Sequence, residues 1–84
     1  MFVVYVLYSS VFDKIYIGYT SDLEKRFASH NLLGKTGWTV RFRPWNIAYT
    51  EQFHSKADAM KREKELKSAK GREFVWREIR KKNY

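Results

Sequence analysis

The chain has 84 residues, no cysteine and a formal net charge of +8 at pH 7. Its length fits one small domain, and the lack of cysteine excludes disulfide scaffolds and cysteine-ligated zinc sites. A domain of this size buries only about 60–65% of its unfolded surface, so its core needs large side chains. Aromatic residues make up 18% of the sequence and supply that volume. We expect one domain over residues 1–84 in a reducing, cytoplasmic compartment.

The positive charge is concentrated in the second part of the chain. Residues 56–84 hold 11 basic and 5 acidic residues, a net charge of +6, whereas residues 1–55 hold 6 and 4, a net charge of +2. The phosphate backbone of a nucleic acid attracts such a surface. A solvated helical surface that keeps a small protein soluble explains the charge equally well, so both interpretations stay open.

Two runs rich in β-branched and aromatic residues begin the chain, at Phe2–Tyr8 and Lys14–Thr20. The residues between them form a turn-length connector, so the pair predicts a β-hairpin. The apolar amino terminus lacks a basic leader and is too short to be a signal or membrane segment. We therefore expect a strand there and no membrane partner.

A helix is expected directly after the hairpin. Ser21 and Glu24 have the spacing of a capping box, which predicts a helix start at Ser21. Gly34 or Gly37 is expected to end the helix. Its apolar side consists of Leu23, Phe27 and Leu33.

The remaining elements follow a loop over residues 34–44 that is rich in glycine and basic residues. Trp45–Phe53 predicts a third strand. Ser55, with Asp58 three positions later, predicts the start of a second helix that runs to about Ala69. Gly71 is expected to break that helix, and a last helix follows with an apolar stripe made of Val75, Trp76 and Ile79.

Glu63 is the most informative carboxylate. On a helical wheel it lies among Ala59, Met60 and Leu66, whereas Glu65 points toward solvent. A carboxylate on an inward-facing stripe is costly unless another group compensates its charge. A hard divalent cation such as magnesium is one such group, because it binds through one or two carboxylates plus waters and substrate phosphate. An inward-facing arginine is the other, so a purely structural ion pair stays open.

Arg26 and His30 are spaced i, i+4 and therefore share one face of the first helix. An arginine fork suits a phosphate group and stabilises charge on its oxygens. An imidazole can accept or relay a proton near neutral pH. The alternative is a solvent-exposed pair without function. His54, at the end of the third strand, is predicted to be a turn residue.

Tyr5 and Tyr16 lie on the two strands of the hairpin, where they either face each other or line one surface together. A phenol has an ordinary pKa near 10, so it becomes a base only when a nearby cation or metal-bound water favours its deprotonation. The alternative is that both rings are core residues, as aromatic side chains in strands of small domains commonly are.

The hairpin resembles the signature of the GIY-YIG nuclease family, with ten residues between the two tyrosines. The matching segments are Val3-Val4-Tyr5 and Tyr16-Ile17-Gly18. Arg26, His30 and Glu63 follow in the order that the family shows. The resemblance covers about Val3 to Lys70 and is greatest to short, stand-alone bacterial members of the excision-nuclease-like type.

The sequence departs from the family pattern at two places. The first half of the signature has no glycine before Tyr5. Many larger members also carry an asparagine about a dozen residues after the metal-binding glutamate, where this chain has Val75. Lys67 or Ser68 is a candidate for part of that role.

The resemblance implies an α+β sandwich around a three-stranded antiparallel sheet flanked by helices, in the order ββαβαα. It also implies hydrolysis of DNA phosphodiester bonds with one divalent metal, magnesium or manganese, and no small-molecule cofactor. Glu63 would hold the metal and Arg26 would bind the scissile phosphate. Tyr5 would act at the attacking water with the help of His30, and Tyr16 would orient the phosphate or the water.

The expected partner is DNA, in a pathway such as DNA repair. With no appended recognition domain in these residues, cleavage selected by DNA structure is expected rather than cleavage at a fixed sequence. Trp38 or Trp45, if exposed, would stack on an unpaired base. The predicted DNA contacts are Lys35, Arg41, Arg43, Lys67, Lys70 and Arg72.

Two alternatives stay open. One is a catalytically weak or inactive nucleic-acid-binding module of the same fold, whose binding would be sensitive to salt and independent of metal. The other is a protein-interaction domain, such as a homodimer, whose interface would bury Trp38 and Trp45.

Overall fold

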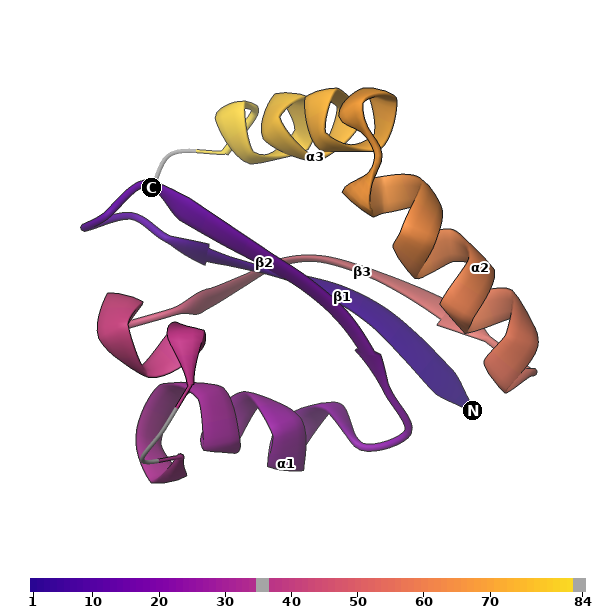
Figure 1. Ribbon diagram of the computed structural model, residues 1–84, viewed down its shortest axis with the longest axis horizontal. Coiled ribbons are helices and arrows are strands. Elements are labelled where there is room, and N and C mark those ends of the chain that lie inside the picture. Colours follow the sequence, from indigo (N-terminus) through magenta and orange to yellow (C-terminus); the bar gives the residue numbers. More distant parts are fainter. Residues whose placement is uncertain (35–36, 83–84) are drawn as a thin grey trace.

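The computed structural model describes residues 1–34 and 37–82 and has the predicted order ββαβαα (Figure 1). None of the described helices has the length and apolar character needed to cross a membrane. The elements are β1 (Phe2–Ser9), β2 (Lys14–Thr20), α1 (Leu23–Ala28), a π-helical segment η1 (Ser29–Leu33), a 3₁₀ helix η2 (Trp38–Phe42), β3 (Asn46–Phe53), α2 (Lys56–Lys67) and α3 (Ala69–Arg80).

The three strands form one antiparallel sheet in the order β2-β1-β3, which confirms the predicted α+β fold. β1 is the central strand and pairs along its length with both neighbours. Because successive side chains of a strand point to opposite faces, β1 supplies two separate clusters. Figure 1 shows α2 and α3 over one face of the sheet, and α1 with the short helices over the other.

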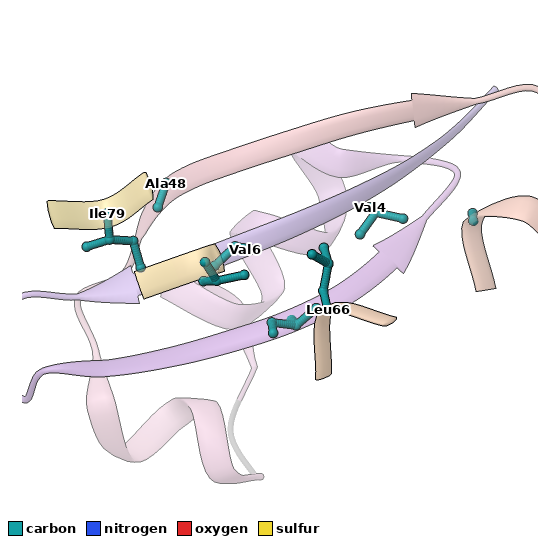
Figure 2. Packing of buried hydrophobic residues seen from close by; sticks show 8 residues of the cluster. Val4, Val6, Ala48, Leu66 and Ile79 are labelled. Atoms are coloured by element: carbon teal, nitrogen blue, oxygen red, sulfur yellow. The ribbon is translucent and has the colours of Figure 1, made fainter. Parts of the chain in front are cut away.

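The first cluster lies between the sheet and the two carboxy-terminal helices. Val4 and Val6 of β1 are fully buried there, against Leu66 of α2 and Ile79 of α3 (Figure 2). Burial of each large aliphatic side chain stabilises the fold by about 1.5–3 kcal/mol. The remaining members are Ile17, Ala48, Ala59 and Val75. Val75 and Ile79 of the predicted stripe on α3 are thus confirmed as core residues.

The second cluster lies on the opposite face of the sheet. Tyr5 and Leu7 of β1 pack there with Trp45, and all three are buried. Leu23 and Phe27 of α1 cover this cluster together with Tyr16 and Phe42. This face therefore brings both hairpin tyrosines next to the helix that follows the hairpin.

The start of α1 differs from the prediction by one residue. Asp22, and not Ser21, is the capping residue: its Oδ1 accepts a hydrogen bond from the main-chain N–H of Lys25 at 3.2 Å. The hydroxyl of Thr20 accepts from the N–H of Asp22 at 3.1 Å, which fixes Asp22 at that position. The predicted cap of α2 is confirmed, because the Ser55 hydroxyl accepts from the N–H of Asp58.

The break between α2 and α3 also lies elsewhere than predicted. α2 ends at Lys67, and Ser68 caps α3 by accepting from the N–H of Gly71. Gly71 lies inside α3, so the expectation that it breaks the helix was wrong. A Cβ at this position would come within 2.0 Å of the carbonyl oxygen of Glu65 and 2.5 Å of the Cα of Leu66. Glycine is therefore needed for close approach of the two helices.

Candidate active site

Tyr5 and Tyr16 lie on the same face of the hairpin. Tyr5 pairs with Gly18, and Tyr16 pairs with Leu7, so the tyrosines are diagonal neighbours across the ladder. Their ring centroids are 6.2 Å apart. A Cβ on Gly18 would lie 2.7 Å from the Tyr5 hydroxyl oxygen and 2.9 Å from Cζ. The Tyr5 ring therefore extends over the backbone of β2, and the space it occupies exists because residue 18 has no side chain.

His30 joins this pair from η1. Its Nε2 atom lies 3.0 Å from the Tyr5 hydroxyl, and its ring centroid lies 4.6 Å from that of Tyr16. The other ring nitrogen, Nδ1, lies 3.0 Å from the hydroxyl of Thr39, a buried residue of η2. Both imidazole nitrogens are thus hydrogen-bonded, and the three side chains form one connected chain. Nothing in the sequence around Thr39 predicts this contact, because it depends on how η2 packs against η1.

Arg43 holds the segment that carries His30. Its Nε donates to the carbonyl oxygen of His30 at 2.7 Å, and its Nη2 donates to the carbonyl oxygens of Ser29 and Gly34 at 3.1 and 2.6 Å. A planar guanidinium with several fixed donors suits such convergent carbonyls. Arg43 was expected from the sequence to contact DNA, and the structure shows it bound to the main chain around η1.

Trp45 fixes the same region from the other side. Its indole Nε1 donates to the carbonyl oxygen of Thr39 at 2.8 Å, and its main-chain N–H donates to Oδ1 of Asn31 at 2.7 Å. Trp45 is only 2% exposed. It is therefore excluded as the residue that stacks on a base, and Trp38, which is 45% exposed, is the remaining candidate.

A pocket of about 280 Å³ opens beside His30, and we call it the catalytic pocket. Arg26 and His30 both line it, as their i, i+4 spacing predicts. Arg26 thus shares one cavity with Tyr16 and His30, although these three residues come from α1, β2 and η1, respectively. The lining residues are Tyr16, Arg26, Ser29, His30, Gly34, Gly37, Trp38 and Thr39.

Glu63 lies on α2 and is not among the residues that line the catalytic pocket. Its side chain is 18% exposed, and its Oε1 lies 3.5 Å from the Nζ of Lys67. Ala59 and Leu66 of the predicted inward-facing stripe are buried, as expected. Met60 is exposed, so the buried face of α2 does not extend to it. Burial is the main cause of the raised pKa of Tyr5, and the negative charge of Glu63 adds a smaller effect in the same direction.

The protonation states of the two central groups follow from their surroundings. Burial raises the pKa of the Tyr5 phenol well above its ordinary value, and the neighbouring Tyr16 adds to this, while the charge of Arg26 opposes it. Burial also lowers the pKa of His30, and the charges of Arg26 and Arg43 lower it further. At neutral pH the site therefore contains a protonated phenol and a neutral imidazole.

The donor set allows one kind of metal and excludes another. Residues 1–34 and 37–82 contain no group of three or more His, Cys, Asp or Glu side chains that could hold an ion. A closed zinc site, which needs four such ligands, does not fit. A single carboxylate does fit magnesium or manganese, because these ions retain waters and bind phosphate oxygens. Glu63 is the residue that could hold such an ion.

The other predicted DNA contacts lie at separate places on the molecule. Lys67 and Arg72 line a second pocket together with Tyr16. Arg41 lies over the ring of Phe42, with 5.9 Å between its Cζ and the ring centroid, and Lys70 lines a separate cavity along α2 and α3. Lys35 lies outside the described residues.

Comparison with known proteins gives one family. Residues 1–79 match the family described as the GIY-YIG catalytic domain. A UPF0213 protein of Staphylococcus haemolyticus is 41% identical over 56 residues, which are 67% of this chain and 68% of that protein. A UPF0213 protein of the archaeon Natronomonas pharaonis is 42% identical over 65 residues, with 77% and 75% covered. A UPF0213 protein of Streptococcus pyogenes is 46% identical over 59 residues, with 69% and 63% covered. No solved structure matches the chain.

Proposed function

The chain belongs to the GIY-YIG family of catalytic domains, a nuclease class, and on that premise we propose that it is a metal-dependent endonuclease that hydrolyses DNA phosphodiester bonds. The observation that carries the proposal is the hydrogen-bonded chain from Tyr5 through His30 to Thr39 beside a pocket lined by Arg26. A core tyrosine alone does not need a histidine at its hydroxyl.

Arg26 and Tyr16 are proposed to bind the scissile phosphate in the catalytic pocket. The guanidinium of Arg26 presents a planar set of donors that suits two phosphate oxygens. These donors also stabilise the negative charge that grows on those oxygens as water attacks the phosphorus. The Tyr16 hydroxyl is proposed to orient the phosphate or the attacking water from the neighbouring wall.

Tyr5 and His30 are proposed to move the proton of the attacking water. Burial keeps the Tyr5 phenol protonated, so it does not act as a resting phenolate. The neutral imidazole 3.0 Å away can accept the phenolic proton as the phenol accepts one from water. His30 is thus the group that ends with the proton, and Tyr5 positions the water and relays the proton.

Glu63 is proposed to hold the divalent ion. Such an ion, when bound, would supply charge for the phosphate oxygens and lower the pKa of a bound water. A mostly covered carboxylate whose ion-pair partner is a lysine 3.5 Å away retains lone pairs for this purpose. The partner Lys67 is half exposed, so the ion pair contributes little to stability and can open readily.

Selection by DNA structure rather than by sequence is proposed for the substrate. The predicted contacts are all lysines and arginines suited to phosphates, and phosphate contacts position a protein without reading sequence. The net charge of +8 supports binding to the backbone at low salt.

The test is cleavage of end-labelled duplex, single-stranded, flap and four-way DNA with magnesium or manganese. Glu63→Gln is compared with Glu65→Gln, a matched change of an exposed glutamate on the same helix. We expect Glu63→Gln to abolish cleavage and to leave metal-free DNA binding intact, whereas Glu65→Gln cleaves like the natural sequence. Binding without cleavage by the natural sequence on every substrate would support a binding module instead. Equal loss in both variants would refute the role of Glu63.

A further inference from the structure

A second pocket of about 240 Å³ adjoins the catalytic pocket, and we call it the side groove. Tyr16 and Trp38 line both cavities, so the two pockets are neighbours that share these side chains as walls. The other lining residues are Ile15, Ile17, Lys67 and Arg72. The side groove thus combines aromatic and aliphatic walls with two cations, a composition that the hydrolytic roles of Tyr5, His30 and Glu63 do not require.

Trp38 packs against two neighbouring aromatic rings and is still partly exposed. Its ring centroid lies 4.6 Å from that of Phe42 and 5.8 Å from that of the buried Trp45. Even so, 45% of Trp38 is exposed. An indole that is held by neighbouring rings and still faces solvent is already positioned for stacking, so little conformational freedom is lost when a flat ring binds.

The two cations lie where the carboxy-terminal helices meet. Arg72 of α3 donates from Nε to the carbonyl oxygen of Lys67 at 3.3 Å, which holds the guanidinium at the end of α2. Both side chains are exposed. A guanidinium and an ammonium beside an aromatic surface match a nucleotide, whose flat base and anionic phosphate need these two kinds of contact.

We propose that the side groove binds an unpaired nucleotide next to the scissile phosphate, with its base on Trp38 and its phosphate at Lys67 and Arg72. This inference rests on the proposed function, because it takes DNA as the ligand. It adds the reason why a distorted or branched DNA is preferred: a base inside an intact duplex is stacked and paired, and cannot reach the indole.

The test measures binding, without divalent metal, of a labelled single-stranded oligothymidylate and of a duplex of the same length. We expect Trp38→Leu to weaken binding of the single strand by about tenfold, the magnitude of one base stacked on an aromatic ring. Binding of the duplex should change by less than about twofold. Trp38→Phe should restore most of the preference. Phe12→Leu is the matched control, because Phe12 is 46% exposed and lines neither pocket.

The phosphate contact is tested by the salt dependence of single-strand binding. Arg72→Gln should reduce the magnitude of the slope of log affinity against log salt by about one, the value of one phosphate contact. Arg77→Gln is the control: Arg77 is on the same helix but outside the side groove, so its change should reduce the slope less.

The outcomes separate this inference from the proposed function. Equal weakening of single-strand and duplex binding by Trp38→Leu, or no weakening, refutes the side groove as a base subsite even if the protein cuts DNA. A Trp38-dependent preference for single strands in a protein that never cuts DNA supports the side groove and refutes the nuclease.

Discussion

The Nδ1 atom of His30 lies 3.0 Å from the hydroxyl of Thr39, while Nε2 of the same ring lies 3.0 Å from the hydroxyl of Tyr5. The partner of one imidazole nitrogen determines which nitrogen carries the proton. When Nδ1–H donates to Thr39, Nε2 is a free acceptor that faces the phenol. In this arrangement Thr39 positions the acceptor through its contact with Nδ1.

Thr39→Val is expected to lower kcat by about tenfold, similar to the loss of an outer partner of a ligating histidine. Valine keeps the shape of threonine but cannot accept from Nδ1–H. KM should change little, because Arg26 and Tyr16 remain in the pocket. Single-turnover cleavage measures the effect, and Thr39→Ser, which retains the hydroxyl, should recover most of the rate. A fall in thermal stability that accounts for the lost rate would contradict this role.

Cleavage is expected to slow as the pH falls, because protonation of His30 removes the acceptor that faces Tyr5. The pKa of His30 is lowered by burial and by Arg26 and Arg43, so the loss begins only below its ordinary value of about 6.5. The folded state therefore binds this proton less readily than the unfolded state. The contribution to stability is complete above about pH 6.5 and is lost as the pH falls through the folded-state pKa. Rate and unfolding measurements between pH 5 and 8 test both statements.

Arg26→Gln should raise the pKa of His30, because it removes one of the two positive charges that disfavour the imidazolium. A titration of the His30 ring signals by NMR measures this shift without any need for activity. The signals are identified by their loss in His30→Gln. An unchanged His30 pKa in Arg26→Gln would show that the guanidinium does not face the imidazole in solution.

Gly18→Ala is expected to cost about 1–3 kcal/mol of unfolding free energy and to abolish cleavage. The new Cβ would lie 2.7 Å from the Tyr5 hydroxyl oxygen, so the ring must move away from His30. Urea unfolding and the cleavage assay measure the two effects. Tyr5→Phe removes the nearest atom, so Gly18→Ala should destabilise the protein less in that background. The same cost in both backgrounds would mean that the Tyr5 hydroxyl is not the atom displaced.

Gly71→Ala should destabilise the protein by about 3 kcal/mol, at the upper end of the usual cost of overpacking. Its Cβ would meet backbone atoms of Glu65 and Leu66, which cannot rotate away as a side chain can. Lys70→Ala, an exposed neighbour in the same turn, is the control and should change stability by less than about 0.5 kcal/mol. Equal unfolding midpoints for the two variants would contradict the close approach of α2 and α3.

The sequence predicted the fold well because its strands and helices carry clear periodic patterns. It predicted Ser55 as a cap but missed Asp22, since Thr20, Ser21 and Asp22 are all capping residue types and only tertiary geometry selects among them. Gly71 was misjudged for a related reason. A glycine that ends a helix and a glycine that admits a neighbouring helix look the same in one sequence.

The candidate site was predicted less completely than the fold. Residues on regular elements, such as Tyr5 and Tyr16, could be placed on the two strands of the hairpin, although the sequence left open whether they face each other or line one surface together. Thr39 lies in the short 3₁₀ helix η2, and Arg43 directly follows it, and five residues are too few to show a period in the sequence. The burial of Trp45 beside the exposed Trp38 likewise follows from packing against Tyr5 and Leu7.

The groups proposed for cleavage come from both layers that the sheet separates. Tyr5 and Tyr16 belong to the cluster covered by α1, whereas Glu63 is carried by α2, which packs on the opposite face (Figure 1). β2 is an edge strand, and Gly18 lets the Tyr5 ring extend over it. These proposed groups therefore come together only when α2 packs on the sheet. If the proposed function holds, phosphodiester cleavage would report the packing of α2 against the sheet as well as the chemistry of the hairpin.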